Sequence, residues 1–178
     1  LNPDIARNTL RFLAAYQGTK VDEWTEEEPG KILHELRRGE MASCLEVPHI
    51  PYYGSVDSTP LFLVLLAETV RWTGDLALAR DMLPHAEQAL SWIDHFGDVD
   101  GDGLVEYVQR SPRGLLNQGW KDSGDGVCYP DGTLPEPPIA LVEVQGYVYA
   151  AKRQMADLYA SLGDDSRAAQ LRAEAAAL

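Results

Sequence analysis

The chain has 178 residues, with 15 basic and 28 acidic side chains and a formal net charge of −13. This length is enough for one compact domain, which we expect to span residues 1–178. Because the acidic balance repels phosphate backbones and anionic lipid surfaces, we expect neither a nucleic-acid partner nor a membrane partner. Two cysteines are too few for a disulfide framework and favour a cytoplasmic location, and a start at leucine suggests a piece of a longer protein.

The first predicted helix covers residues 3–16, where apolar side chains recur near helical spacing after a cap at Asn2. Residues 19–57 carry Pro, Gly and three consecutive glutamates without a sustained period, so they predict a long loop, and loops of this length are often functional. Residues 61–72 follow a Ser-Thr-Pro cap and are apolar on nearly every side, which predicts a helix that is buried all round.

The second half of the chain repeats this alternation of helices and loops. Residues 75–96 predict either one helix kinked at Pro84 or two shorter helices, and residues 97–138 form a second long loop. Helices over 139–162 and 164–178, separated by a Gly-Asp turn, complete the chain. No alternation of strands and helices is visible, so we expect an all-α fold of helical hairpins whose long loops gather at one end.

The densest chemical cluster, at residues 117–126, reads Asn-Gln-Gly-Trp-Lys-Asp-Ser-Gly-Asp-Gly. It places the ring of Trp120, the ammonium of Lys121 and the carboxylates of Asp122 and Asp125 within six residues. Sugar hydrolysis needs an apolar surface against the pyranose ring and a carboxylic acid that protonates the leaving oxygen. The alternative interpretation is an Asp/Gly-rich turn with its carboxylates in solvent.

Two other segments carry candidate sugar-binding groups. Tyr53 and Asp57 precede the most apolar predicted helix, where an acid could bind sugar hydroxyls beside a stacked tyrosine, although Asp57 could instead only cap the helix. Glu143 and Gln145 open a later helix and could face the same cleft as Trp120. A glutamate at a helix start is also favoured by the helix dipole alone.

Residues 98–106 are similar to a calcium-binding loop, with glycine at position six. The acidic side chains at positions one, three, five and nine are Asp98, Asp100, Asp102 and Glu106. Position twelve, which should be a bidentate glutamate, is Gln109, so we assign no metal ligands and no cofactor. Calcium at this loop stays open as an alternative to a tight turn that the carboxylates organise through backbone N–H groups.

Five segments, taken in order, resemble the amylo-α-1,6-glucosidases, the glycogen debranching enzyme related family of six-hairpin glycosidases. That group also includes trehalase-like and mannosylglycerate-hydrolase-like enzymes. The segments are residues 29–35, 53–60, 98–107, 117–125 and 143–147, and the resemblance covers about residues 3–162. It implies an (α/α)6 toroid, of which this chain would form about half, and inverting hydrolysis of an α-glucan or a small α-glucoside.

The resemblance also implies roles for individual residues. Asp122 lies in a Gly-Trp-Lys-Asp-Ser segment that matches the general-acid segment of related enzymes, and Asp125 is the close alternative. The residues expected to bind the donor sugar are Tyr53, Asp57, Trp120, Lys121, Glu143 and Gln145. The general base of such enzymes is a glutamate in a later hairpin, so we expect it outside this chain, which alone would have little activity. An incomplete ring could also associate with a second copy of itself.

Two other functions compete with hydrolysis. A non-catalytic scaffold of the tetratricopeptide kind is the main alternative, because residues 150–175 look like one half-repeat, although no matching period is detectable. The toroid also hosts epimerases and polysaccharide lyases. His34 and His49 make a poor epimerase pair, and the acidic net charge argues against a cleft for uronates.

Overall fold

A computed structural model describes residues 2–178 of the chain. Its helices are α1 (Pro3–Ala15), α2 (Glu40–Ser43), α3 (Ser58–Thr73), α4 (Leu76–His95), α5 (Val142–Ser161) and α6 (Asp165–Ala177). The only strand-like pairings among these residues are isolated bridges, so the protein is all-α, as its sequence predicts. None of the helices in residues 2–178 combines the length and the apolar character that a membrane crossing requires.

Side-chain caps and glycines set the helix ends. Asn2, Asp75 and Asp164 each accept a hydrogen bond from a backbone N–H in the first turn, at 2.9–3.0 Å. The turn between α3 and α4 uses Gly74 at a φ of 68°, a left-handed conformation that glycine adopts without a Cβ clash. Pro84 lies inside α4 without ending it, so residues 76–95 form one helix.

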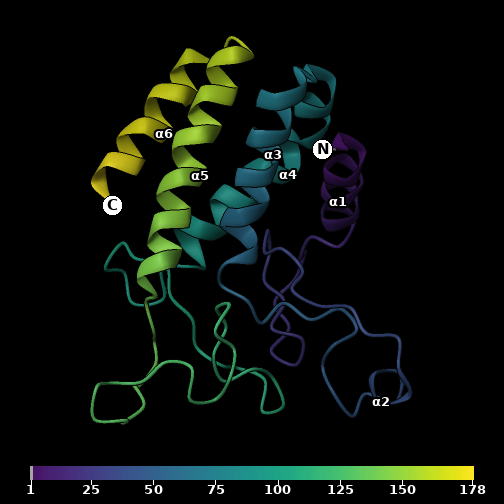
Figure 1. The fold of residues 1–178 in the computed structure, drawn as a ribbon, viewed down its shortest axis with the longest axis vertical. Helices are drawn as coiled ribbons and strands as arrows, with labels where there is room; N and C mark the ends of the chain where they lie inside the picture. The colour runs from purple at the N-terminus through teal and green to yellow at the C-terminus, as the bar shows by residue number, and fades with distance from the viewer. Residues whose placement is uncertain (1) are drawn as a thin grey trace.

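The helices run in two directions, and both long loops lie at one end of the molecule (Figure 1). α3 and α5 run from the loop end to the short turns, whereas α1, α4 and α6 run back toward the loops (Figure 1). α3 packs against α1, α4 and α5, and α5 also packs against α6. The predicted hairpins with clustered long loops are therefore present, and the loops are the place where distant segments can meet.

Hydrophobic burial and a few ion pairs join the hairpins. Leu66 of α3, Leu90 of α4 and Met155 of α5 are fully buried in one core. Burying a side chain of this size stabilises a fold by roughly 1.5–3 kcal/mol. Ion pairs help to fix how the helices are oriented to one another: the Lys152 ammonium of α5 lies 2.6 Å from the Asp94 carboxylate of α4.

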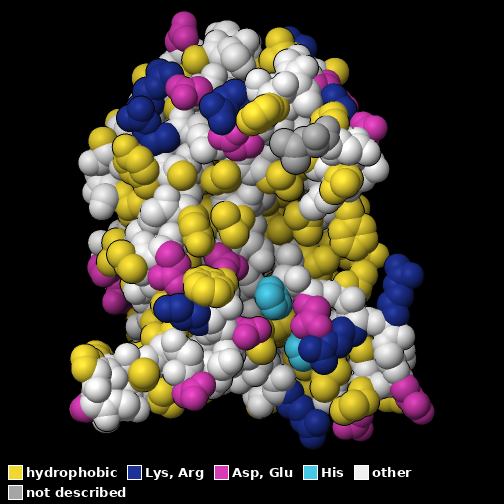
Figure 2. Space-filling model, viewed as in Figure 1, with side chains coloured by type: hydrophobic (Ala, Val, Ile, Leu, Met, Phe, Trp, Pro, Cys, Tyr) yellow, Lys and Arg dark blue, Asp and Glu magenta, His cyan; other side chains and the backbone are white. Residues whose placement is uncertain are grey.

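α3 is not buried all round, and the prediction that it would be is wrong. Leu61 and Trp72 of this helix are 40% and 74% exposed. α3 packs against α1, α4 and α5, but these contacts leave Leu61 and Trp72 accessible to solvent. α5 has a similar open side, with Val142 and Tyr149 exposed. Hydrophobic side chains spread across the middle of the face in Figure 2, where α3 and α5 lie in Figure 1.

Candidate functional site

Three segments that stand out in the sequence meet where α3 and α5 begin. The backbone N–H of Val56, which precedes Asp57, donates to the Gln118 carbonyl at 2.8 Å. Gly119 lies against Leu141, because a Cβ at Gly119 would come within 2.4 Å of the Leu141 side chain. The loop before Trp120 therefore contacts the residues that precede both helices, and it joins regions that are far apart in the sequence.

Asp57 occupies the N-cap position of α3, but its carboxylate makes no capping hydrogen bond. Ser55 takes that role: its hydroxyl oxygen accepts the Ser58 N–H at 3.2 Å. The same hydroxyl is 2.6 Å from one carboxylate oxygen of Asp57 and donates to it. The half-buried Asp57 is thus oriented by Ser55, and its second oxygen has no protein partner in residues 2–178.

A buried asparagine fixes the loop that contains Asp122. Asn117 is 3% exposed, accepts the Tyr107 hydroxyl at 2.9 Å, and donates to the Ser123 carbonyl at 2.5 Å. The backbone next to Asp122 is therefore anchored, and Asp125 lies in the turn that the Gly126 N–H closes on the Ser123 carbonyl at 2.8 Å; both aspartates are exposed. Neither carboxylate has a hydrogen-bond or ion-pair partner within residues 2–178.

Trp120 offers an apolar surface to solvent at this site, since 68% of the residue is exposed. The ammonium of Lys121 lies 5.8 Å from the centre of its ring. An exposed ring next to a cation and free carboxylates can stack on a sugar and bind its hydroxyl groups.

The other three expected sugar-binding residues differ in what their side chains already contact. Tyr53 is buried and donates its hydroxyl to the Tyr16 carbonyl at 2.7 Å, and its burial raises the pKa of the phenol to about 12. Gln145 accepts the Val105 N–H at 2.9 Å and donates to the Val105 carbonyl at 2.7 Å. Glu143, half-buried in the first turn of α5, has no such partner in the described chain.

A buried polar network, not predicted from the sequence, joins the loop before α3 to the loop that contains Asp122. Glu26, which is 2% exposed, accepts the Ser111 N–H at 3.1 Å and a short hydrogen bond from the side-chain amide of Gln118. Burial raises the pKa of the Glu26 carboxyl, and these donors lower it in part. Glu26 therefore holds Gln118, whose carbonyl in turn meets the start of α3.

Glu28 forms the second half of this network. It accepts the indole N–H of Trp92 at 2.8 Å, and its oxygens lie 3.5 Å from Lys31 and 3.4 Å from Arg110. Burial lowers the pKa of the Lys31 ammonium, whereas the carboxylates of Glu28 and Glu26 raise it. The sequence does hold a sign of this network: three consecutive glutamates stand directly before Pro-Gly-Lys, a high density of charge for a loop that packs against the core.

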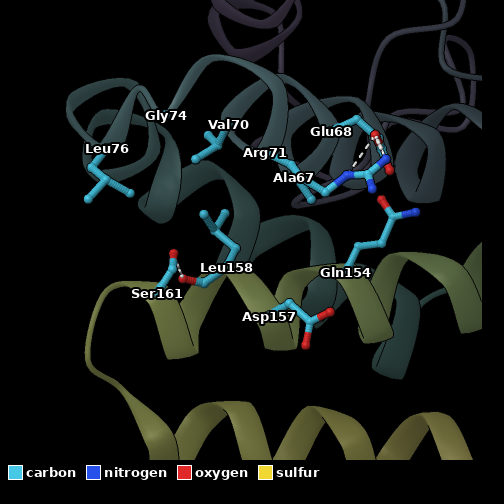
Figure 3. Close-up of a pocket in the computed structure, with 10 residues that line it drawn as sticks. All are labelled: Ala67, Glu68, Val70, Arg71, Gly74, Leu76, Gln154, Asp157, Leu158 and Ser161. Carbon is cyan, nitrogen blue, oxygen red and sulfur yellow. Dashed lines mark hydrogen bonds and ion pairs between the residues drawn. The ribbon is translucent and has the colours of Figure 1, made fainter.

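A hollow of about 330 Å³ lies elsewhere, between the last turns of α3 and α5 (Figure 3). Its lining includes Glu68, which pairs with Arg71 at 2.5 Å, and Asp157, which pairs with Arg172 at 2.9 Å. Because these charges are already paired and the other lining residues are mostly apolar, the hollow offers no convergent catalytic groups. It lies at the end opposite the long loops (Figure 1).

Comparison of the sequence with protein-family models finds no match, and comparison with curated proteins finds none either.

Proposed function

We propose that this chain is part of an (α/α)6 glycosidase that hydrolyses α-linked glucose-type sugars with inversion. The observation that carries the proposal is the meeting of three segments at the starts of α3 and α5. Gln118 contacts the residue before Asp57, and Gly119 contacts the residue two positions before Glu143. Carboxylates and an exposed indole are thereby gathered at the loop end, as sugar hydrolysis requires.

The helix arrangement supports the toroid. In such a ring, parallel inner helices line the centre and antiparallel outer helices cover them, and here α3 and α5 run together while α4 and α6 return (Figure 1). The open, partly apolar sides of α3 and α5 would face the centre. Ile5 and Phe12 of α1 are 68% and 46% exposed and would be covered by another hairpin, or by a second copy of the chain.

In the proposed reaction, Asp122 donates its proton to the glycosidic oxygen as the bond from that oxygen to the anomeric carbon breaks. A water molecule attacks the anomeric carbon from the opposite face, and a general base outside this chain takes its proton. The two carboxyl groups of an inverting enzyme are about 6.5–9.5 Å apart. Trp120 stacks on the sugar, and Asp57, Lys121 and Glu143 bind its hydroxyl groups.

Trp120→Ala is expected to weaken the binding of maltose or isomaltose to this chain by about 5- to 10-fold, because a stacked aromatic ring contributes roughly 1–1.5 kcal/mol. Isothermal titration calorimetry measures the effect. The matched control is Trp72→Ala, which removes a ring that is equally exposed but lies at the far end of α3.

The control should bind both disaccharides as the wild type does. If the wild type binds neither disaccharide, the sugar site is refuted, and a helical-repeat scaffold becomes the better account of the fold.

A further inference from the structure

The loop between α4 and α5 begins with a compact cluster of acidic groups that the sugar site does not use. Asp98, Asp100, Asp102 and Glu106 each place a carboxylate oxygen within 4.8 Å of the others. None of the four forms an ion pair with a basic side chain of residues 2–178. Four like charges at this spacing repel one another strongly unless a cation lies between them.

Glu106 distinguishes this cluster from an ordinary acidic turn. It is 5% exposed, and its Oε2 atom is buried without a hydrogen-bond partner in the described chain. The carboxylate nevertheless faces the three aspartates. A buried carboxylate with no donor is costly, so its position at the base of the cluster points to a ligand that supplies positive charge.

The loop holds the aspartates in place before any ligand binds. Asp98 accepts the N–H groups of Gly101 at 2.7 Å and Gly103 at 3.1 Å. Both glycines have positive φ, 83° and 90°, which lets the chain turn tightly around the cluster. At its end the loop is closed by the Glu106 N–H, which donates to the Gly97 carbonyl at 2.8 Å.

We propose that Asp98, Asp100, Asp102 and Glu106 bind one Ca²⁺ ion. The donors are all carboxylate oxygens with no histidine or cysteine, which selects a hard cation, and four carboxylates from one irregular loop suit the variable geometry of Ca²⁺ better than the strictly octahedral geometry of Mg²⁺. The site differs from an EF-hand, whose bidentate glutamate stands at position twelve, because here position twelve is Gln109 and the buried carboxylate comes from position nine.

The ion would also steady the sugar site, although the calcium proposal does not depend on that site. Tyr107 follows Glu106 directly, and its hydroxyl donates to Asn117, the residue that anchors the loop of Asp122. Gln145 of α5 holds Val105 on the other side of Glu106. A cation at the cluster therefore fixes a segment that connects α4, α5 and the loop of the proposed general acid.

Calorimetric titration of the chelator-treated chain with CaCl₂ tests the proposal. The expected result is one Ca²⁺ per chain with a Kd between about 10⁻⁶ and 10⁻³ M. Calcium at about 100 times its Kd should raise Tm by about 5–10 °C. The same concentration of MgCl₂ should raise Tm much less. No binding of Ca²⁺, or tighter binding of Mg²⁺ than of Ca²⁺, would overturn the assignment.

Two variants locate the site. Asp98→Asn and Glu106→Gln should each weaken Ca²⁺ binding at least 10-fold, whereas Asp131→Asn, in another exposed turn, should not change it. In calcium-free buffer Glu106→Gln should have a higher Tm than the wild type, because it removes the buried unpaired charge. In saturating calcium the wild type should have the higher Tm. Unchanged Ca²⁺ affinity in either variant, or a lower Tm of calcium-free Glu106→Gln, would contradict the proposal.

Discussion

Replacing Asp122 with asparagine is expected to lower kcat for α-glucoside hydrolysis by about 10²–10⁴-fold in the complete toroid to which we propose this chain belongs. Asparagine keeps the shape of the side chain but cannot donate a proton to the leaving oxygen. Steady-state kinetics with maltose and isomaltose measure the loss. KM should change little, because asparagine has nearly the same size as aspartate and can still form hydrogen bonds to the substrate.

We propose Asp122 as the acid and Asp125 as the alternative, so Asp125→Asn is the matched control. Both side chains are exposed, and the Ser123 carbonyl that lies between them accepts from the side-chain amide of Asn117 and from the Gly126 N–H. Asp125→Asn should retain kcat within a few fold. If Asp125→Asn lost activity while Asp122→Asn kept it, the assignment of the acid would be wrong.

The leaving group offers a second check on the role of Asp122. In an α-glucosyl fluoride the fluoride leaves without being protonated. Asp122→Asn should therefore slow hydrolysis of this substrate far less than hydrolysis of a disaccharide. An equal loss for both substrates would mean that Asp122 acts in binding or in positioning.

Glu28→Ala is expected to reduce the free energy of unfolding by about 3–5 kcal/mol, because it removes the carboxylate that pairs with the buried Lys31 ammonium and the acceptor of the Trp92 indole N–H. Within residues 2–178 the Lys31 ammonium would keep only its hydrogen bond to the Glu26 carbonyl. Lys31 and Glu28 are each 6% exposed, so water cannot replace the lost carboxylate easily. Urea unfolding monitored by circular dichroism measures the change.

A control and a rescue make this prediction specific to the buried network. Glu46→Ala removes an exposed glutamate whose oxygen is 3.9 Å from Arg113, and it should cost at most about 0.5 kcal/mol. Glu28→Leu combined with Lys31→Met removes both charges and should be much less destabilising than Glu28→Ala. A loss below about 1 kcal/mol for Glu28→Ala would show that the network contributes little.

Local signals were enough to predict the five long helices, whereas the short α2 lies within residues 19–57, which were predicted to form a loop. Asn2, Asp75 and Asp164 are residues that cap helices from their own side chains, and each does so. Gly74 ends α3 by a conformation that depends on its own backbone alone. Pro84 left two interpretations open, since a proline in the middle of a helix is tolerated when its neighbours keep packing, and in α4 they do.

The open side of α3 and the buried network in the loops could not be predicted in this way. An apolar sequence predicts burial but does not say which neighbours provide it, and here Leu61 and Trp72 remain exposed although three helices pack against α3. The partners of Glu26 lie 85 and 92 residues away, at Ser111 and Gln118. Pairings at such separations depend on the assembled fold and leave no periodic trace in the sequence.

The sequence suggests which residues could form the proposed site but not which of their segments meet. The sequence pointed to Asp57, Trp120 and Glu143 as residues of the right chemistry, and the structure brings their segments together. It also shows that the Tyr53 hydroxyl and the Gln145 amide are already hydrogen-bonded to backbone groups, which no spacing in the sequence could indicate.

The most direct test of the sugar site is to map binding on the ¹⁵N-labelled chain by two-dimensional NMR during titration with maltose and isomaltose. The proposal predicts that shift changes concentrate at residues 55–58, 117–125 and 141–146, where the three segments meet. Shift changes confined to the hollow between the last turns of α3 and α5, or no changes at saturating sugar, would contradict it.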